Sequence, residues 1–415
     1  MAGQPPTRDE QFMQQALELA SKGVALASPN PCVGAVLVDG NGKVIGSGTH
    51  TYEGRKHAEV LALEAAGDRA RGATLYVNLE PCSHVGRTGP CTEALITAGV
   101  KRVFVAMRDP NPAVSGRGLA RLRDAGIEVR EGLGEAEAKK LNESFAKYIR
   151  QKTPFVTLKT AMTLDGKIAP PPGEGATPSV LAPLTASGGW ITSEEARAHV
   201  HELRHANDAI MVGVGTVVAD DPLLTDRTGL PRRRPLLRVI LDSRLRLPLD
   251  SRVVKTARED VIVFCCFAEE NKRRELEARG VIVEQVPMRR PVEDGTIPFP
   301  GSSPTIDGRP DLEKVLANLG EREITSLIIE GGAMVNWAAL SAGVVDKIFF
   351  YYAPKILAGT GSIPFALGAG YRRISEAAYV KSLVLHRFGE DFAVEGYLRD
   401  PYTNDIHLVA APGQD

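Results

Sequence analysis

Four residues in the first quarter of the chain have the types and the spacing of a hydrolytic zinc site. His57 and Glu59 form a His-x-Glu pair, and two Pro-Cys pairs further along supply Cys82 and Cys91. One imidazole and two thiolates hold Zn²⁺ firmly and leave a fourth position for water, whose pKa the metal lowers towards neutrality. A nearby carboxylate can move protons without touching the metal. The sequence therefore predicts that His57, Cys82 and Cys91 bind Zn²⁺ and that Glu59 is the catalytic proton carrier.

This spacing is typical of zinc-dependent base deaminases, which remove an amino group from a ring carbon of a nucleobase. Their usual signature has Cys-x-x-Cys, whereas eight residues separate Cys82 from Cys91 here. The alternative is that a common His-x-Glu pair and two buried thiols lie close in sequence without a joint role. The combination of all the ligands in a strand–loop–helix context favours the zinc site.

The elements that must position these residues alternate between strand and helix. We expect a hairpin over residues 33–45, a helix over 57–66, a strand over 74–79 and a helix over 91–98. Such alternation predicts an α/β domain, with a mostly parallel sheet and helices on both faces. A long polar helix, residues 135–149, is expected to close the domain.

A second α/β domain is expected to follow, which gives domains 1–150 and 151–415. Two Pro/Gly-rich stretches, residues 169–186 and 290–310, are interpreted as surface insertions in it. Its apolar strands are predicted at residues 155–159, 209–214, 236–241, 261–265, 281–286, 327–329 and 347–357.

Two of these strands end in glycine turns. Gly213-Val214-Gly215-Thr216 follows one strand, and Glu330-Gly331-Gly332 follows another and precedes a helix. Glycines at such places let backbone N–H groups approach a phosphate at a helix N-terminus, so the pair indicates a nucleotide cofactor. Neither turn fits the full G-x-G-x-x-G pattern, and ordinary tight turns are the alternative.

Polar side chains near these turns are candidates for substrate contacts. Arg204 and Arg227 could pair with a phosphate, because a guanidinium binds phosphate in bidentate fashion. Asp220 and Glu330 could hold sugar hydroxyls, and the Asn30 amide in the first domain could contact a base edge or a ribose. The alternatives are solvated charges, loop caps and an Asx turn.

Three histidines recur in one predicted helix of the second domain, at His199, His201 and His205. No cysteine or second metal motif accompanies them. We interpret them as surface residues.

Composition limits the partners. The chain has 415 residues, 43% of them hydrophobic, and a net charge of −1, which gives no electrostatic reason to expect nucleic acid or an anionic membrane as partner. No apolar run approaches the ~20 residues that span a bilayer. Five cysteines and a polar N-terminus without a leader pattern indicate a cytoplasmic protein. We expect a small-molecule substrate and a homo-oligomer, either a dimer or a tetramer.

At this point the sequence resembles the bifunctional riboflavin-biosynthesis deaminase–reductase family. The motif that carries the resemblance runs from Pro81 to Cys91 and reads Pro-Cys-Ser-His-x-Gly-Arg-Thr-x-Pro-Cys, with the family's own spacing between the cysteines. The segments Asn30–Gly34 and Asp109–Pro112 also match. The resemblance extends from Gln11 to about Arg399.

The resemblance implies a cytidine-deaminase-like three-layer α/β domain followed by a dihydrofolate-reductase-like α/β domain. The first would deaminate 2,5-diamino-6-ribosylamino-4(3H)-pyrimidinone 5′-phosphate with Zn²⁺, and the second would reduce the ribosyl group to ribityl with NADPH. The implied cofactor-binding residues are Met162, Trp190, Thr216, Asp220, Ser243, Gly332, Ala333, Met334, Val335, Asn336, Trp337 and Ala338. The implied substrate-binding residues are Asn30, Gly188, Arg204, Leu224, Arg227 and Glu330, and Lys159 and Asp165 match the family's first strand and loop.

Two departures from the family pattern keep other functions open. Gly188 stands where the family usually has a serine, beside a long Pro-rich loop, and Gly89 replaces a common proline between the cysteines. An active deaminase joined to an impaired reductase is therefore one alternative. A reductase with a non-catalytic first domain and a nucleoside or RNA deaminase with an unrelated tail are the others.

Overall fold

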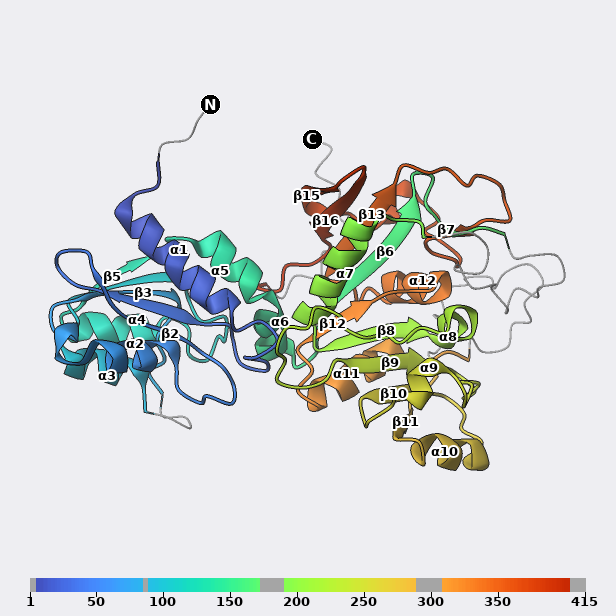
Figure 1. Cartoon of the computed structure of the whole chain (residues 1–415), viewed down its shortest axis with the longest axis horizontal. Coiled ribbons are helices and arrows are strands. Elements are labelled where there is room, and N and C mark those ends of the chain that lie inside the picture. Colours follow the sequence, from blue (N-terminus) through green and yellow to red (C-terminus); the bar gives the residue numbers. More distant parts are fainter. Residues whose placement is uncertain (1–4, 85–88, 172–189, 289–307, 404–415) are drawn as a thin grey trace. The chain divides into compact units, whose positions relative to one another are not determined.

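The computed structural model describes residues 5–84, 89–171, 190–288 and 308–403 (Figure 1). The chain divides into two compact units, the first formed by Met1–Lys152 with Pro231–Arg234 and the second by Thr153–Leu230 with Pro235–Asp415. Each unit has a sheet covered by helices, so both are α/β bodies. Within the described part of the chain, none of the helices combines the length and the apolarity needed to cross a membrane.

The first unit is built on a five-stranded sheet with the order β2-β1-β3-β4-β5. β1 pairs antiparallel with β2 and β3, whereas β3, β4 and β5 run parallel. The strands are β1 Gly34–Val38, β2 Val44–Thr49, β3 Thr74–Leu79, β4 Arg102–Met107 and β5 Glu128–Glu131. The helices are α1 Arg8–Ser21, α2 Ala58–Ala66, α3 Cys91–Ala98, α4 Arg117–Asp124, α5 Glu135–Leu141 and α6 Glu143–Gln151, with a short 3₁₀ helix at Gly67–Ala70.

The helices of the first unit form two layers. α1 and α5 pack on one face of the sheet, and α2, α3 and α4 pack on the other (Figure 1). α2 approaches β2 closely because two glycines face it: a Cβ on Gly46 would lie 2.1 Å from the Ala62 carbonyl oxygen, and one on Gly48 would lie 2.3 Å from that of Ala58. This contact fixes the start of α2, where His57 and Glu59 lie.

The single helix predicted over residues 135–149 is wrong, because the chain breaks at Asn142 into α5 and α6. The buried Asn142 side chain accepts a hydrogen bond from the Cys32 N–H at 2.8 Å and donates to the Cys32 carbonyl oxygen at 3.1 Å. An asparagine that pairs with another segment's backbone competes with the helix at its own position. The Asn142 side chain at this break therefore anchors the segment that carries Asn30.

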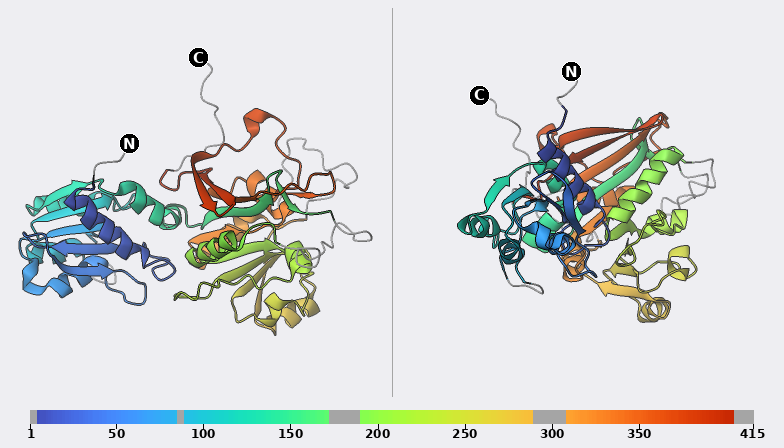
Figure 2. Two further views of the ribbon diagram at one scale, coloured as in Figure 1. Left: turned by 45° about the horizontal axis from the view of Figure 1, so that its top comes forward. Right: turned by 60° about the vertical axis from the view of Figure 1, so that its left-hand side comes forward.

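The second unit contains a nine-stranded sheet with the order β11-β10-β9-β8-β12-β6-β13-β16-β15. Its pairs are parallel from β11 to β13, and β16 and β15 add antiparallel pairs at one edge, shown in red in Figure 2. These strands are β6 Phe155–Thr163, β8 Ala209–Gly213, β9 Leu237–Leu241, β10 Val261–Cys265, β11 Val281–Gln285, β12 Ser326–Ile329, β13 Lys347–Ala353, β15 Lys381–Phe388 and β16 Asp391–Tyr397. A separate two-stranded sheet joins β7 Lys167–Ala169 to β14 Ile363–Pro364.

Helices cover this sheet on both sides. One apolar cluster joins α11 and α12 to the sheet, another joins α8, α9 and α10 to it, and a third packs α7 against β13 and β16. The helices are α7 Glu194–Ala206, α8 Val214–Asp220, α9 Arg252–Lys255, α10 Glu270–Glu277, α11 Leu312–Glu321 and α12 Ala333–Ser341, with a 3₁₀ helix at Ile374–Glu376.

The strands predicted in the second domain are present, with shifted ends. The elements not predicted from the sequence include α8, α9, β7, β14, β15 and β16. Most of the two Pro/Gly-rich stretches, residues 169–186 and 290–310, lies outside the described residues.

Candidate metal centre and cofactor site

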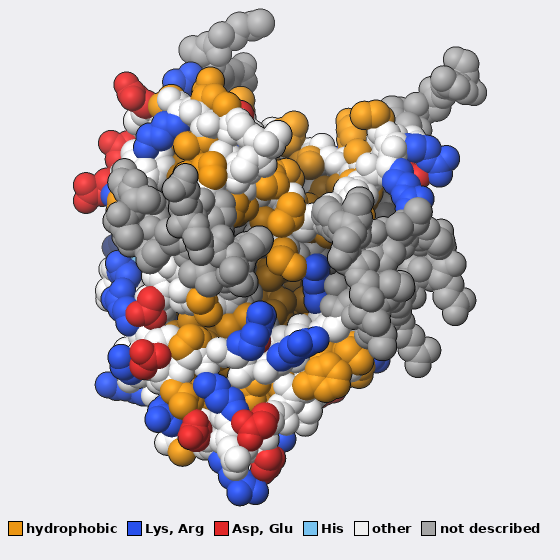
Figure 3. Space-filling view, turned by 90° about the vertical axis from the view of Figure 1, so that its right-hand side faces the viewer, with side chains coloured by type: hydrophobic (Ala, Val, Ile, Leu, Met, Phe, Trp, Pro, Cys, Tyr) orange, Lys and Arg blue, Asp and Glu red, His pale blue; other side chains and the backbone are white. Residues whose placement is uncertain are grey.

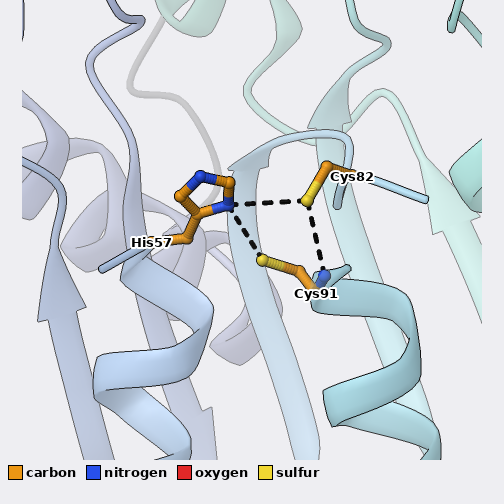
Figure 4. A group of neighbouring side chains, drawn as sticks. All are labelled: His57, Cys82 and Cys91. Carbon is orange, nitrogen blue, oxygen red and sulfur yellow. Dashed lines mark hydrogen bonds between the residues drawn. The ribbon is translucent and has the colours of Figure 1, made fainter. Parts of the chain in front are cut away.

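The three predicted zinc ligands come together at one end of the first unit's sheet (Figure 4). His57 is the N-cap of α2, Cys82 follows β3, and Cys91 is the first residue of α3. The Nδ1 atom of His57 lies 3.1 Å from the Cys91 Sγ and 3.5 Å from the Cys82 Sγ. The three ligand atoms all lie within 4.8 Å of one another.

This donor set fits zinc. Tetrahedral Zn²⁺ with Zn–S bonds of about 2.3 Å and Zn–N bonds of about 2.0 Å places sulfur and nitrogen about 3.5 Å apart. The observed separations of 3.1 and 3.5 Å are close to that value. Two sulfurs and one imidazole also leave the fourth position to a non-protein ligand, as a catalytic rather than a structural site requires.

The charges around the centre favour a proton carrier next to a metal. The hydrogen bond with the Cys91 thiol lowers the pKa of Cys82 to about 4, and the pKa of Cys91 is raised by the same bond. The hydrogen bond with Cys82 raises the pKa of His57. Glu59 lies in the first turn of α2 and is only 3% exposed, and burial raises the pKa of its carboxyl group. A carboxyl with a raised pKa can both take and return a proton near neutral pH.

Glu80 supports the cysteine-bearing segment and was missed in the sequence. Its buried carboxylate accepts hydrogen bonds from four backbone N–H groups, at 3.1 Å from Asp109, 2.9 Å from Gly116, 2.8 Å from Gly118 and 3.4 Å from Leu119. These bonds tie the end of β3 to the start of α4, one peptide unit before Pro81-Cys82. A lone glutamate after a strand carries no pattern that distinguishes it in sequence.

Asn30 is exposed and its side-chain amide is held by His50. The Nδ2 atom of Asn30 lies 3.0 Å from His50 Nε2, and His50 Nδ1 lies 2.9 Å from the Lys56 carbonyl oxygen. A carbonyl only accepts, so His50 Nδ1 carries the hydrogen and Nε2 accepts from Asn30. The Asn30 Oδ1 atom is therefore directed away from this bond. The His50 ring lies 5.5 Å from that of His57, edge to face, which places Asn30 beside the metal centre.

In the second unit, the structure brings Lys159, Arg204 and Glu330 into one buried ion group. Arg204 binds Glu330 with two N–H groups, at 2.6 and 2.9 Å, and the Lys159 Nζ lies 3.5 Å from Glu330 Oε2. Burial acts to raise the pKa of Glu330, but Arg204 and Lys159 lower it to about 2. Burial also lowers the pKa of the Lys159 ammonium group.

The two predicted glycine turns lie side by side. The Gly213 N–H donates to the Gly331 carbonyl oxygen at 3.0 Å, and a Cβ on Gly332 would lie 3.4 Å from Thr216 Oγ1. Gly332 is the N-cap of α12, and Gly213 is the N-cap of α8. Two helix N-termini thus start at neighbouring strand ends, which suits the phosphates of a dinucleotide.

Some of the other residues implied for the cofactor lie near the same strand ends, and others lie further away. Met162 is buried on β6, and Asn336 of α12 donates to Thr160 Oγ1 at 3.3 Å and to the Phe365 carbonyl oxygen at 2.6 Å. Trp190 is 61% exposed, with the Arg197 guanidinium 4.9 Å from its ring centre. Asp220 ends α8, Ser243 follows β9, and the segment from Gly332 to Ala338 forms the N-terminal part of α12.

The three remaining residues implied for the substrate are Arg227, Leu224 and Gly188. Arg227 is exposed, whereas the Leu224 side chain is buried in the apolar cluster around β8 and β9, so only its backbone is left for a substrate. Gly188 lies outside the described residues.

Gly89 is exposed, and a Cβ there would meet nothing within 4 Å, so the missing proline costs no contact.

The interpretation of the three helical histidines as surface residues is wrong. His205 is buried, with Nδ1 2.7 Å from Asp226 Oδ2, and His199 Nδ1 lies 2.6 Å from the Tyr351 hydroxyl. His201 is half-buried. His199 lies against Phe349 and Tyr351 of β13, whereas His205 contacts the loop that carries Asp226, and the spacing of the histidines in the sequence indicated neither contact.

Figure 3 shows one face of the second unit with a hollow whose walls are largely hydrophobic and whose margin carries Lys and Arg side chains. A concave apolar surface with a few charged groups is the usual form of a cofactor site.

Two family matches divide the chain as the structure does. Residues 6–107 match "Cytidine and deoxycytidylate deaminase zinc-binding region", and residues 154–374 match "RibD C-terminal domain". Together with the two sites, these matches define the class of protein, a zinc-dependent deaminase joined to a reductase.

The chain belongs to the RibD family of riboflavin-biosynthesis enzymes. It is 42% identical over 387 residues to the riboflavin biosynthesis protein RibD of Aquifex aeolicus, which covers 93% of this chain and 97% of that protein. The structure of Acinetobacter baumannii RibD matches with a TM-score of 0.75 and 35% identity over 94% of this chain and 98% of that one. A diaminohydroxyphosphoribosylaminopyrimidine deaminase/5-amino-6-(5-phosphoribosylamino)uracil reductase from Thermotoga maritima matches with a TM-score of 0.73 and 38% identity, over 94% of this chain and 98% of that one.

These matches confirm the predicted family, fold class and pair of activities. The protein is a bifunctional enzyme with a Zn²⁺-dependent deaminase and an NADPH-dependent reductase domain, and it acts on a small-molecule pyrimidine. They give no support to an impaired reductase, a scaffold domain or a nucleic-acid deaminase.

Proposed function

We propose that the first unit hydrolyses the amino group of 2,5-diamino-6-ribosylamino-4(3H)-pyrimidinone 5′-phosphate and that the second unit reduces the ribosyl group of the product to ribityl. The observation that carries this proposal is the cluster of His57, Cys82 and Cys91 beside buried Glu59, on the same chain as the ion group around Glu330. The T. maritima protein, matched over nearly its whole length, bears the names of both reactions.

In the deaminase site, His57, Cys82 and Cys91 would hold zinc, which supplies the Lewis acid that makes water nucleophilic at neutral pH. Glu59 would take a proton from the attacking water and deliver it to the ring nitrogen and the departing ammonia. Its raised pKa suits this exchange. Asn30, whose Nδ2 is bound to His50, would accept a hydrogen bond from the substrate through Oδ1.

In the reductase site, NADPH supplies the hydride, and the chain supplies orientation and a proton. The glycine turns at Gly213 and Gly331-Gly332 would receive the cofactor's phosphates. Lys159, whose pKa is lowered by burial, would donate the proton that balances the hydride at the sugar, and Glu330 would hold Lys159 in place. Arg227 would meet the substrate's phosphate.

We propose that the functional domains are residues 1–150 and 151–415. The boundary between the two compact units falls between Lys152 and Thr153, next to the boundary that the sequence indicates. The short segment Pro231–Arg234, which groups with the first unit, lies outside that simple division.

We propose a homo-oligomer formed through the sheet edge at β15. This edge strand is largely exposed, and its exposed side chains include Leu383, Val384 and Leu385. An apolar edge strand is a template for pairing with another chain, and a second copy presents the same edge. Light scattering of the wild type and of Leu385→Lys tests this: a monomeric wild type would contradict it.

We propose a cytoplasmic location, because the five cysteines are free thiols and two of them are in the metal cluster. A reducing compartment preserves thiols. Recovery of the enzyme with membranes or outside the cell on fractionation would contradict this.

A coupled assay tests the proposed reactions. Purified zinc-loaded protein is given the diaminopyrimidine phosphate, and ammonia release and NADPH loss are followed together. Glu59→Gln should abolish both signals and regain NADPH loss when the deaminated substrate is added. Lys159→Met should keep ammonia release and lose NADPH oxidation. Ammonia release that survives in Glu59→Gln would contradict the proposed role of Glu59.

A further inference from the structure

We infer that His201 is a further substrate-binding residue of the reductase, whose Nε2–H donates a hydrogen bond to the substrate's phosphate. The inference rests on the proposed reductase function and adds a contact to that site. His201 belongs to neither set of residues that the family resemblance implied.

The position of His201 on α7 directs it to the loop that carries Arg227. His201, Arg204 and His205 are three and four residues apart, so they share one face of the helix. Arg204 Nη1 donates to the Thr225 carbonyl oxygen at 3.0 Å, and His205 Nδ1 lies 2.7 Å from Asp226 Oδ2. These two bonds hold the segment before Arg227 against the face from which His201 projects.

The state of the ring follows from its surroundings. The Nδ1 atom of His201 is buried and has no hydrogen-bond partner among the described residues, whereas Nε2 is not among the buried unpaired atoms. A buried N–H without an acceptor is rarer than a buried acceptor without a donor, so Nδ1 is the unprotonated nitrogen and Nε2 carries the hydrogen.

Burial and the nearby arginines keep the ring neutral. Burial, Arg204 and Arg227 lower the pKa of His201, and Glu330 and Asp226 act in the opposite direction with less effect. A second proton would also create an unpaired N–H on the buried Nδ1. His201 is therefore a neutral donor near neutral pH.

A phosphate at this site needs such a donor. Three N–H groups of Arg204 are bound to Glu330 and the Thr225 carbonyl oxygen, whereas Arg227, on the loop held by α7, is exposed and can approach a phosphate. A neutral N–H adds a charge-assisted hydrogen bond to a phosphate oxygen without adding another cation beside Lys159 and Arg204.

The test compares His201→Leu with His201→Gln in the full-length zinc-loaded enzyme. The deaminated substrate is offered with its 5′-phosphate and as the dephosphorylated riboside. The glutamine amide nitrogen reaches about as far as Nε2, so it restores the donor. A hydrogen bond to a charged group contributes about 1.5–3 kcal/mol, so His201→Leu should raise KM for the phosphate about 10-fold or more. In His201→Leu, neither kcat nor the KM for the riboside should change. The KM of His201→Gln for the phosphate should stay within about 3-fold of the wild-type value.

The exposed neighbour Glu202→Gln serves as the control on the same helix and should behave as wild type. If His201→Leu does not fold, His201→Asn replaces it, because the asparagine amide ends near the Nδ1 position and cannot reach the phosphate. An unchanged KM in the donor-free variant, an equal rise for the riboside, or no rescue by glutamine overturns the inference. A wild type that reduces neither substrate contradicts the proposed function itself.

Discussion

At the scale of single residues, Lys159, Arg204 and Glu330 form a buried ion group in the reductase half. All three side chains are at most 15% exposed, so their charges have lost most of their hydration. Two cations around one carboxylate offset that loss, and removal of one member of a buried pair leaves an uncompensated charge. The group therefore holds Lys159 at the site and makes its position depend on Glu330.

Glu330→Gln tests this dependence. The variant should lose about 3 kcal/mol of unfolding free energy in the second unit and at least 100-fold in NADPH oxidation, because Arg204 and Lys159 remain buried without the carboxylate that both of them bind. Ammonia release should persist. Denaturant unfolding and the two assays check the result, and Glu202→Gln is the charge-matched exposed control. A stable variant with normal reduction would remove Glu330 from the site.

The pH dependence of stability follows from the same carboxylate. The pKa of Glu330 is lowered from the usual 4.5 to about 2, so the folded state binds this proton at a lower pH than the unfolded state does. The stabilisation is complete above the unfolded pKa and is lost as pH falls through about 2. The difference in unfolding free energy between wild type and Glu330→Gln should shrink as pH is lowered from about 5 to 3. A constant or growing difference would contradict the assignment.

At the scale of elements, the metal centre depends on how closely α2 lies on β2. His57 and Glu59 are at the start of α2, and no side chain separates that helix from Gly46 and Gly48. Cys82 and Cys91 come from the loop after β3 and from the start of α3. The distance between helix and strand therefore sets the distance between the imidazole and the two sulfurs.

Gly48→Ala should push α2 outward, because its Cβ would lie 2.3 Å from the Ala58 carbonyl oxygen. Such overpacking costs about 1–3 kcal/mol and should reduce bound zinc and ammonia release together, with the reductase unaffected. Metal analysis and thermal unfolding measure this. Gly40→Ala is the matched control, since a Cβ there meets nothing within 4 Å. Full zinc content in Gly48→Ala would show that α2 can shift without moving its ligands.

At the scale of the whole molecule, the residues proposed for each reaction fall within one compact unit. His57, Glu59, Cys82 and Cys91 all belong to the first unit, and Lys159, Arg204 and Glu330 all belong to the second. We therefore expect the cluster of His57, Cys82 and Cys91 to be required for ammonia release and not for NADPH oxidation.

Removal of zinc with a chelator should abolish ammonia release and leave NADPH oxidation of the deaminated substrate within about 2-fold of the untreated enzyme, since the metal stabilises the folded state of its own unit. Zinc added back should restore ammonia release. Loss of both reactions on chelation, with both restored by zinc, would show that the reductase also depends on the metal.

Much of the site could be predicted from local sequence, because its residues occur in short motifs at strand ends. The three-ligand cluster and the two adjacent glycine turns are of this kind. The pairing of Arg204 with Glu330 could not be predicted, because the two residues are 126 positions apart in the sequence. They meet because the sheet order places β12 beside β8, the strand that follows α7. The predictions for Asn142 and His205 were wrong for a related reason: each side chain forms a hydrogen bond with a residue on another segment.

A backbone hydrogen bond links Cys82 to the start of α3. The Thr92 N–H donates to the Cys82 carbonyl oxygen at 3.1 Å, the Cys91 N–H lies 3.4 Å from the Cys82 sulfur, and Glu80 secures the strand end before them. The end of β3 and the first turn of α3 are thus held together directly through Cys82. For protein engineering, this makes the strand end with Glu80 and Cys82 a part that has to be carried over together with the start of α3 when the site is grafted onto another scaffold.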